Sequence, residues 1–209
     1  MIPDCLQVSV LEPAGAVSYW PQWLPTEQSR AAFLALREEL DWRQLPVRMF
    51  GRWIPQPRLV DFHADAGVSY TYAGLQLDGR GWPPLLESLR AAASAQAGVS
   101  FNSVLCNLYR DGKDYMGWHA DDEPELGVNP TIASVSLGAE RRFLMRPRQA
   151  PRQPRHEWRL ADGSLLLMTG QVQHHWHHQM PKALRVHEPR INLTFRRIVP
   201  MPSASKKNP

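Results

Sequence analysis

Cysteine and long apolar runs are scarce in this sequence. Its 209 residues include two cysteines, Cys5 and Cys106, which are far apart. Their number and spacing exclude a disulfide framework and a cysteine zinc motif, so we expect two free thiols. No apolar run approaches the length of a bilayer span, which argues against a membrane protein. The opening residues MIPDCLQVSV also lack the basic and apolar regions of a secretory signal, which predicts a cytoplasmic protein.

The composition is typical of a soluble globular chain, with 43% hydrophobic and 21% charged residues. A chain of this length can bury one sizeable core, so we expect a single domain over residues 1–209 that works as a monomer. Within it we expect an N-terminal part over 1–100 and a core rich in strands over 101–199. The tail PMPSASKKNP, residues 200–209, has few apolar residues, which predicts disorder.

Arginine is unevenly distributed, although the net charge of the whole chain is only +4. One stretch is rich in arginine and contains only two acids, Glu140 and Glu157. Such a local excess suits a polyanionic partner. Charge runs are more often ordinary surface, however, and we favour a solvated loop broken by prolines. The arginines of this stretch are Arg141, Arg142, Arg146, Arg148, Arg152, Arg155 and Arg159.

Two amphipathic helices are predicted in the first half of the chain. Residues 26–40 have apolar positions at helical spacing, with Thr26 available as N-cap. Residues 83–97 begin with prolines, and Gly98 is placed to end the helix. Between them, residues 47–77 are rich in aromatics and short alternating runs, which predicts hairpins. From residue 101 many short strands follow one another, which is typical of an antiparallel sandwich or barrel. These strands are SVLCNLY, TIASVSLG, RRFLMRP, HEWRL, SLLLMTG, HHWHHQM and RINLTFRRIV.

The segment RINLTFR alternates strictly between apolar and polar residues, so Arg190, Asn192 and Arg196 share one face of a predicted strand. An outer strand with a solvated face would give this pattern. Two arginines on one face could equally hold a dicarboxylate, since guanidinium groups bind carboxylates in bidentate fashion. In VLCNLY, Asn107 and Tyr109 also share a face, and they could complete such a pocket or cap a turn.

Histidines and a carboxylate suggest a metal site. His119 and Asp121 stand at alternate positions, so on an extended backbone they project to one side and can chelate one ion. A mononuclear non-heme iron centre needs two histidines and one carboxylate. The run HHWHHQMP offers the third ligand, and if it forms a strand, His174 and His178 share one face. Alternation alone does not choose between these two, and one or two of the four histidines, which include His175 and His177, are expected to be structural.

Four segments together resemble the AlkB family of iron(II)- and 2-oxoglutarate-dependent dioxygenases: NLYRDGKDYMGWHADDE, PTIASVSLGAERRF, HWHHQMP and PRINLTFR. Their order and spacing match over roughly residues 47–198. The resemblance implies an α+β fold, with a double-stranded β-helix (jelly-roll) core, N-terminal helices and a nucleotide-recognition lid. It implies His119, Asp121 and His178 as ligands of Fe(II). It also implies a pocket for the cosubstrate 2-oxoglutarate, formed by Asn107, Tyr109, Arg190, Asn192 and Arg196.

The branch of the family that repairs duplex DNA is the most similar, because MFGRWIPQPR and DAGVSYTYAG resemble its lid. The resemblance then implies that 1-methyladenine and 3-methylcytosine in DNA are demethylated at the expense of O2 and 2-oxoglutarate, with release of formaldehyde, succinate and carbon dioxide. Phe50 would be a wedge that fills the gap left by a flipped base, although by itself it fits an ordinary core aromatic equally well. The other implied substrate contacts are Arg58, Tyr70, Tyr72, Asp122 and Glu123.

Two departures from that branch concern the substrate. The lid reads Tyr72-Ala73 where phenylalanine and serine are usual, and a basic trio that grips the complementary strand is reduced to Lys182 and Arg185. Both single- and double-stranded alkylated DNA therefore remain candidate substrates. The alternatives are an RNA demethylase with the same mechanism, a jelly roll that holds zinc without redox chemistry, and a nucleic-acid binding module without catalysis.

Overall fold

A computed structural model describes residues 7–11, 15–49, 51–72, 74–152 and 156–199. Cys106 is a buried free thiol, as predicted. Cys5, Phe50, Ala73, Arg155 and the tail 200–209 lie outside the described residues, so the predictions made for them stay predictions.

The larger of two main sheets has seven strands. All of its pairings are antiparallel, and β15 lies in its interior between β10 and β8. In sheet order the strands are β1 (Gln7–Val10), β2 (Gly15–Trp20), β13 (Ser164–Gly170), β10 (Ile132–Gly138), β15 (Arg190–Arg196), β8 (Ser103–Tyr109) and β5 (Leu59–Ala64).

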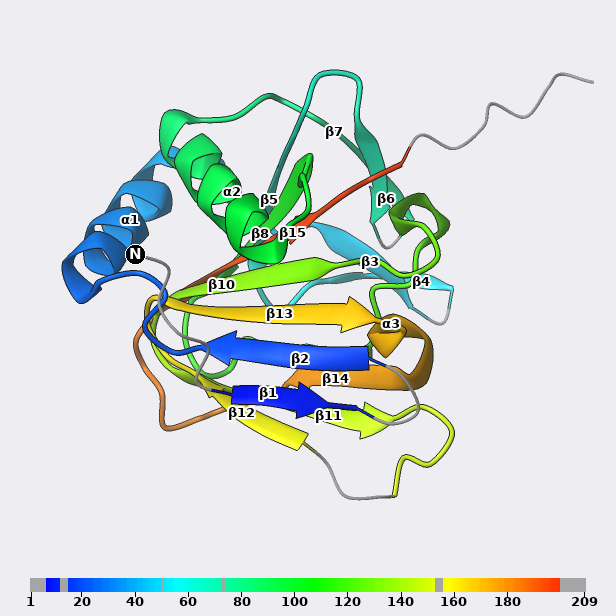
Figure 1. Ribbon diagram of the computed structural model, residues 1–209. Helices are drawn as coiled ribbons and strands as arrows, with labels where there is room; N and C mark the ends of the chain where they lie inside the picture. The colour runs from blue at the N-terminus through cyan, green and yellow to red at the C-terminus, as the bar shows by residue number, and fades with distance from the viewer. Residues whose placement is uncertain (1–6, 12–14, 50, 73, 153–155, 200–209) are drawn as a thin grey trace, which may run out of the picture.

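The second main sheet has four antiparallel strands and contributes buried aromatics to a core shared with the larger sheet. Two stacked antiparallel sheets around one apolar core form the predicted jelly roll, and Figure 1 shows the strands of the two sheets in adjacent layers. In sheet order the strands are β12 (His156–Leu160), β11 (Arg141–Pro147), β14 (Trp176–Met180) and β9 (Met116–His119).

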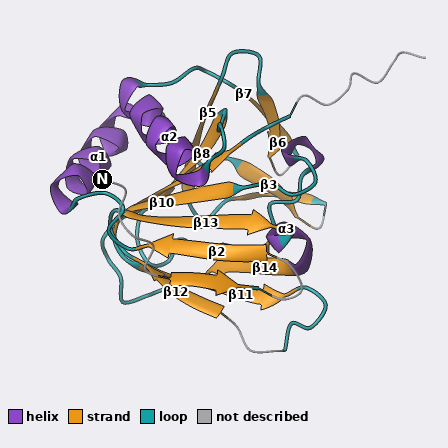
Figure 2. Cartoon of the chain, in the orientation of Figure 1, coloured by secondary structure: helices purple, strands orange, loops and turns teal. Residues whose placement is uncertain are grey.

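Two long helices cover the outer face of the larger sheet, α1 (Thr26–Glu39) and α2 (Pro84–Ala97). They share a second apolar cluster with the sheet residues that point away from the smaller sheet, and Figure 2 shows them together on one side. Gly98 ends α2 with φ 65°, as predicted. The predicted cap of α1 is wrong: Thr26 is the first helical residue, Pro25 occupies the N-cap, and no side chain caps the helix. Among the described residues, no helix has the length and apolarity needed to cross a membrane.

The region between the helices forms hairpins, as its sequence predicts. One two-stranded ribbon consists of β3 (Pro46–Met49) and β4 (Arg52–Pro55), and another of β6 (Ser69–Tyr72) and β7 (Leu75–Asp78). Strand β5 lies between them in the chain and joins the edge of the larger sheet beside β8. We refer to the two ribbons, together with residues 56–58 that connect β4 to β5, as the lid.

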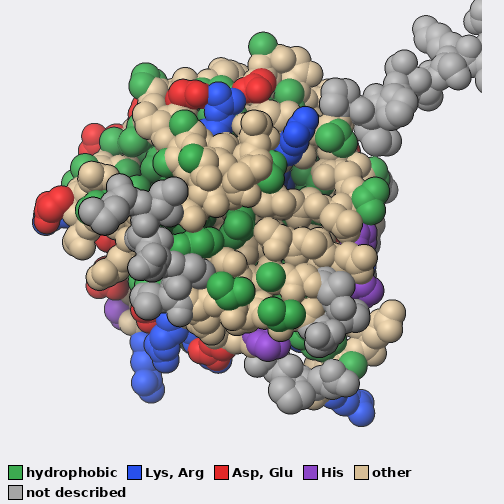
Figure 3. Space-filling model, in the orientation of Figure 1, with side chains coloured by type: hydrophobic (Ala, Val, Ile, Leu, Met, Phe, Trp, Pro, Cys, Tyr) green, Lys and Arg blue, Asp and Glu red, His purple; other side chains and the backbone are tan. Residues whose placement is uncertain are grey.

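The arginine-rich stretch is not a loop, since most of it forms the paired strands β11 and β12. Its side chains have partners: Arg142 and Arg159 form ion pairs with Glu157 and Glu140 at 2.7 and 3.3 Å. Basic and acidic side chains are also interspersed on the face of the molecule in Figure 3. The alternation of the two strands places Arg142 and Arg159 outside, which the interpretation as a loop overlooked.

Candidate active site

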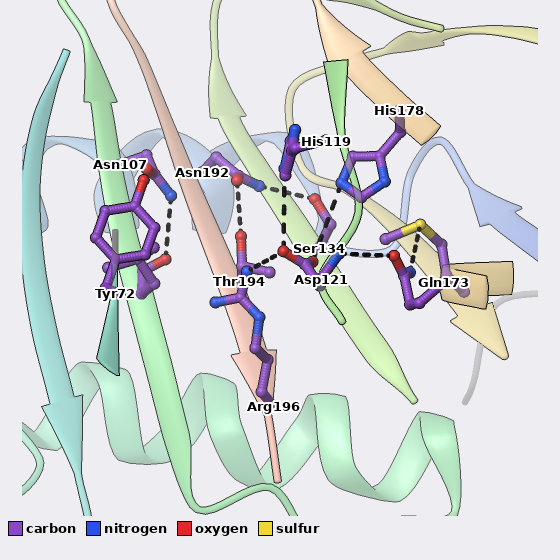
Figure 4. A network of polar contacts seen from close by, with 12 residues as sticks. Tyr72, Asn107, His119, Asp121, Ser134, Gln173, His178, Asn192, Thr194 and Arg196 are labelled. Carbon is purple, nitrogen blue, oxygen red and sulfur yellow. Dashed lines mark hydrogen bonds and ion pairs between the residues drawn. The ribbon is translucent and has the colours of Figure 1, made fainter. Parts of the chain in front are cut away.

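Two antiparallel strands bring the first two predicted ligands together. His119 on β9 and His178 on β14 are directly opposite each other in the register. Their ring centroids are 4.1 Å apart, and both imidazoles point toward Asp121 (Figure 4). The pairing of two edge-proximal strands therefore places two histidine nitrogens side by side, although the histidines are far apart in the sequence.

Asp121 lies just beyond β9, in the segment that leads to the short helix η1 (Pro124–Leu126). Its carboxylate oxygens are 3.9 Å from His119 Nε2 and 4.0 Å from His178 Nε2. One ligand atom from each of the three residues lies within 4.8 Å of the others. Two imidazoles and a carboxylate in such a cluster are the donor set of a mononuclear non-heme iron site.

The histidine run is not one continuous strand, which corrects the prediction for His174. The helix α3 (Val172–His175) precedes β14, so His174 is exposed and its Nε2 contacts the carbonyl oxygen of Val128 instead of the cluster. His177 lies on the outer side of β14. Of the two histidines that alternation left open, His178 alone joins the three-residue cluster.

The protonation states suit a metal ion. Burial, and then the neighbouring His119, lowers the pKa of His178 to about 3, so this imidazole is neutral. His119 Nδ1 donates a hydrogen bond to the carbonyl oxygen of Gly117 at 2.9 Å, which leaves the lone pair on Nε2, facing the cluster. Burial opposes the ionisation of Asp121, but the charge of Arg196 and its hydrogen bond to this carboxylate, together with the neighbouring histidines, outweigh burial and lower the pKa of Asp121 to about 2. Neutral imidazoles and an ionised carboxylate are the states that bind a metal.

The polar face of β15 lines the same pocket, and all seven residues of this strand are buried. The interpretation of β15 as an outer strand with a solvated face is therefore wrong. Ile191, Leu193 and Phe195 point to the helices, and the polar face points to the interior of the sandwich. The predicted cosubstrate residues Asn107, Tyr109, Arg190, Asn192 and Arg196 all line the pocket, together with the three residues of the cluster.

Arg190 is a buried cation without an acidic partner among the described residues. It is 2% exposed, and among the described residues no carboxylate forms an ion pair with it. Its Nη2 donates to the hydroxyl oxygen of Ser136 at 2.9 Å, whereas its Nε has no partner there. Burial lowers the pKa of its guanidinium to about 10, although the nearby Tyr109 opposes this shift. An unpaired buried charge is costly, so the site suits a carboxylate from a ligand.

Arg196 differs from Arg190 because it already has a partner within the protein. Its Nη2 donates to Asp121 Oδ1 at 2.9 Å, and the guanidinium carbon lies 5.7 Å from the centre of the Tyr70 ring. Burial opposes the charge of Arg196, but Asp121 outweighs this effect and raises its pKa. Its predicted contact with the near carboxylate of 2-oxoglutarate stays a prediction. The structure adds that Arg196 orients a residue of the metal cluster.

The lid reaches the pocket through Arg58 and Tyr72. Arg58 is 3% exposed; its Nε donates to Asn107 Oδ1 at 2.8 Å, and its guanidinium also donates to the Tyr72 hydroxyl oxygen. The Tyr72 hydroxyl donates in turn to Gln56 Oε1 at 3.1 Å. Both side chains line the pocket, so any contact of Arg58 with a nucleic acid would occur inside it.

The remaining predicted substrate residues lie around the pocket at different depths. Tyr70 is 1% exposed and packs beside Phe62 and Tyr72. Glu123 is partly buried, and burial together with the charge of Asp121 raises its pKa. Asp122 is exposed and forms an ion pair with Arg148 at 2.7 Å. The roles of these residues toward a base stay predictions.

Sequence reasoning missed Gln173, which is 0% exposed and accepts a hydrogen bond from the backbone N–H of Asp121 at 2.9 Å. No local signal announces this contact, since the two residues are distant in the sequence and glutamine is common on surfaces.

Two histidines, a carboxylate and an unpaired arginine in one jelly-roll pocket fit iron(II) and a dicarboxylate, and the comparisons with known proteins agree. The family described as the 2OG-Fe(II) oxygenase superfamily matches residues 16–196. The chain is therefore an iron(II)- and 2-oxoglutarate-dependent dioxygenase. Two kinds of curated relative narrow this class further, and with them the chain belongs to the AlkB family.

The first kind of relative is the DNA oxidative demethylase ALKBH2. The mouse protein is 44% identical over 160 residues, which cover 74% of this chain and 67% of that protein. The human protein is 43% identical over 159 residues, which cover 73% and 61%. The second kind is the human alpha-ketoglutarate-dependent dioxygenase alkB homolog 3, 36% identical over 202 residues, which cover 92% of this chain and 70% of that protein. The chain thus spans about two thirds of the length of these relatives.

The solved structure of OsALKBH1 has a similar fold. It matches 91% of this chain and 100% of its own with a TM-score of 0.64, at 14% sequence identity. At this identity the likeness supports the fold alone.

Proposed function

We propose that this dioxygenase removes N-linked methyl groups from damaged bases in DNA, with 1-methyladenine and 3-methylcytosine as substrates. The observation that carries the proposal is the single pocket that holds the cluster of His119, Asp121 and His178, the unpaired Arg190 and the lid residue Tyr72. The relatives named DNA oxidative demethylase support the choice of DNA. When bound, iron(II) and 2-oxoglutarate supply oxidation of the methyl carbon by O2, with release of formaldehyde, succinate and carbon dioxide.

In this proposal the cluster of His119, Asp121 and His178 holds the iron. Arg190 forms an ion pair with the far carboxylate of 2-oxoglutarate and is preorganised for it, since its Nη2 is already fixed by Ser136. Tyr109 lies against Arg190, with the guanidinium carbon 5.4 Å from the ring centre, and limits where that arginine can point. Asn107 on β8 is oriented by Arg58 of the lid, so one hydrogen bond links the cosubstrate side of the pocket to the lid.

The proposed base site lies on the lid side of the pocket. Tyr72 offers an aromatic ring on which a flipped base can stack, and Glu123 lies beside the neighbouring Tyr70. The methylated bases carry a positive charge, so the carboxylates of Asp122 and Glu123 favour them over undamaged bases. Methylation at the pairing edge also lowers the cost of extruding such a base.

Reconstitution of the purified protein tests the proposal. Metal-free protein is supplied anaerobically with Fe(II), 2-oxoglutarate and an oligonucleotide that contains 1-methyladenine, and formaldehyde and succinate are followed after O2 is admitted. We expect the two products in equal amounts. Succinate without formaldehyde, or neither product, would overturn the DNA proposal. Matched DNA and RNA oligonucleotides at equal salt decide between DNA and RNA as the preferred substrate.

An ordinary zinc site is a poorer account of this pocket. A structural zinc ion is held by four protein ligands and does not require a dicarboxylate clamp. The cluster supplies three ligands, and Arg190 awaits an anion. Binding of 2-oxoglutarate to the Mn(II)-loaded protein distinguishes the two accounts, because a zinc-only site predicts no such binding.

A further inference from the structure

The three residues of the metal cluster are held in different ways. His119 and His178 stand opposite each other on paired strands, so the hydrogen bonds between β9 and β14 fix their backbones. Asp121 belongs to no strand or helix. Its Cα position and the direction of its carboxylate must therefore be fixed by side-chain contacts instead of by strand pairing.

Gln173 supplies one such contact, at the backbone of Asp121. Its side chain, on α3, is fully buried, and its Oε1 accepts the backbone N–H of Asp121 at 2.9 Å. Its Nε2 donates to the Met168 sulfur at 3.5 Å, so both ends of the amide are engaged. Figure 4 shows Gln173 and Arg196 reaching Asp121 from two directions, one at the backbone and the other at the carboxylate.

Arg148 also connects the segment of Asp121 to the helix α3. Its Nη1 donates to Asp122 Oδ2 at 2.7 Å and to the backbone carbonyl of Gln173 at 3.1 Å. Its backbone N–H donates to the carbonyl of His175 at 2.8 Å. The segment of Asp121 and Asp122 is thus joined to α3, and α3 leads directly into the strand of His178.

We infer that Gln173 is a positioning residue for metal binding, which acts through the backbone of Asp121. The inference deepens the proposed function and rests on the iron site it includes. Loss of the acceptor would leave a buried N–H of Asp121 without a partner, and such a group rearranges to find one. The carboxylate would then leave its place between the two imidazoles. Groups that orient metal ligands typically change metal affinity by about 10- to 100-fold when they are replaced.

The test measures the affinity for Mn(II) alone, from the EPR signal of the free ion during a titration of metal-free protein. The variant Gln173→Met has a side chain of similar length but cannot accept the hydrogen bond. We expect its dissociation constant for Mn(II) to rise by about 10- to 100-fold. Gln173→Glu keeps an acceptor oxygen at the same reach. We expect it to bind Mn(II) at least tenfold more tightly than Gln173→Met does. The control Gln171→Met changes an exposed glutamine at the start of α3 and should bind like the wild type.

Equal affinities of wild type and Gln173→Met would overturn the inference. It would also be overturned if Gln173→Glu lost as much affinity as Gln173→Met, because both variants lose the Nε2 donor to Met168, and that contact and not the acceptor would then be responsible. If Gln173→Met does not fold, Gln173→Asn replaces it, since the same amide one methylene shorter cannot span the distance. Failure of the iron site itself is seen separately: wild type and His119→Ala would then bind Mn(II) equally.

Discussion

The wall of the pocket, formed by strands β8 and β15, and the lid differ in how their strands are paired and buried. The strands β8 and β15 lie inside a sheet of seven strands, and every one of their residues is buried. Strand β4 of the lid belongs to a ribbon of only two strands, and every one of its residues is exposed. Arg190, Asn192 and Arg196, which are predicted to contact the cosubstrate, therefore stand on a strand that is held on both sides, whereas β4 of the lid is held on one side and presents exposed side chains to a nucleic acid.

This contrast predicts that substrate recognition and the binding of metal and cosubstrate can be altered separately. An isolated ribbon of two strands is at best marginally stable in water, so the lid depends on its contacts with the wall. One of these is the hydrogen bond from Arg58 to Asn107. Changes in the lid should alter the choice of substrate and leave metal and cosubstrate binding intact. Changes in β8 and β15 should impair cosubstrate binding and leave the choice of substrate intact.

The largest effect is expected from His178→Ala. Loss of one of the three clustered ligands removes the metal, so formaldehyde formation should fall to background and Mn(II) binding should be lost. The adjacent His177→Ala, on the outer side of the same strand, serves as the control and should retain turnover. Full activity of His178→Ala together with inactivity of His175→Ala would show that the wrong histidine has been assigned.

The next effect concerns Arg190→Met. Loss of one partner of a buried charge pair costs about 2–5 kcal/mol, so the KM for 2-oxoglutarate should rise by roughly 30-fold or more. Because Arg190 is buried without an acidic partner, its removal should also raise the free energy of unfolding of the protein without cosubstrate. Kinetics and urea unfolding measure the two effects. A lower stability together with an unchanged KM would contradict the role given to this arginine.

A smaller effect is expected from Tyr72→Phe. The change removes a hydroxyl that connects Arg58 to Gln56 but keeps the aromatic ring. A lost hydrogen bond of a buried group is worth about 1–3 kcal/mol, part of which the lid regains by rearranging. We expect the ratio of kcat/KM for 1-methyladenine and 3-methylcytosine to change by up to about tenfold. An equal change in the KM for 2-oxoglutarate would contradict the prediction that the lid affects substrate choice without affecting cosubstrate binding.

The smallest effect is expected from Trp53→Ala in β4. Trp53 is 53% exposed, so its removal should leave the urea unfolding midpoint unchanged. If the lid contacts the nucleic acid, loss of a stacking surface worth about 1 kcal/mol should weaken binding of single-stranded DNA roughly fivefold. Fluorescence anisotropy at fixed salt measures this affinity. Leu34→Ala, which removes an exposed side chain from α1, is the matched control and should bind like the wild type.

The strands with regular alternation could be predicted from the sequence. Strand β8 coincides with SVLCNLY and β15 with RINLTFR, because one face of each packs on the helices and the other lines the pocket. Strands β2 and β9 were not predicted. GAVSYW begins with a glycine, and MGWH is short, contains a glycine and pairs on one side only, so neither shows the period of a strand.

The site was predictable where the residue type carries the chemistry. His119 and Asp121 follow from their spacing, but alternation alone could not separate His174 from His178, because the helical turn α3 interrupts the run without a clear local signal. Contacts such as those of Gln173 with Asp121, or of Arg58 with Asn107, join residues that only the folded chain brings together. Their side chains are ordinary in the sequence and become informative only through burial.

The placement of Cys106 protects its thiol from the oxidising centre. Its side chain lies in the apolar cluster beneath the helices, while its neighbour Asn107 faces the pocket, so the backbone of β8 separates the sulfur from the oxidising centre. Burial also raises the pKa of the thiol, which keeps it in the unreactive protonated form. We therefore expect iodoacetamide to leave this sulfur unlabelled in the native protein, both before and after turnover.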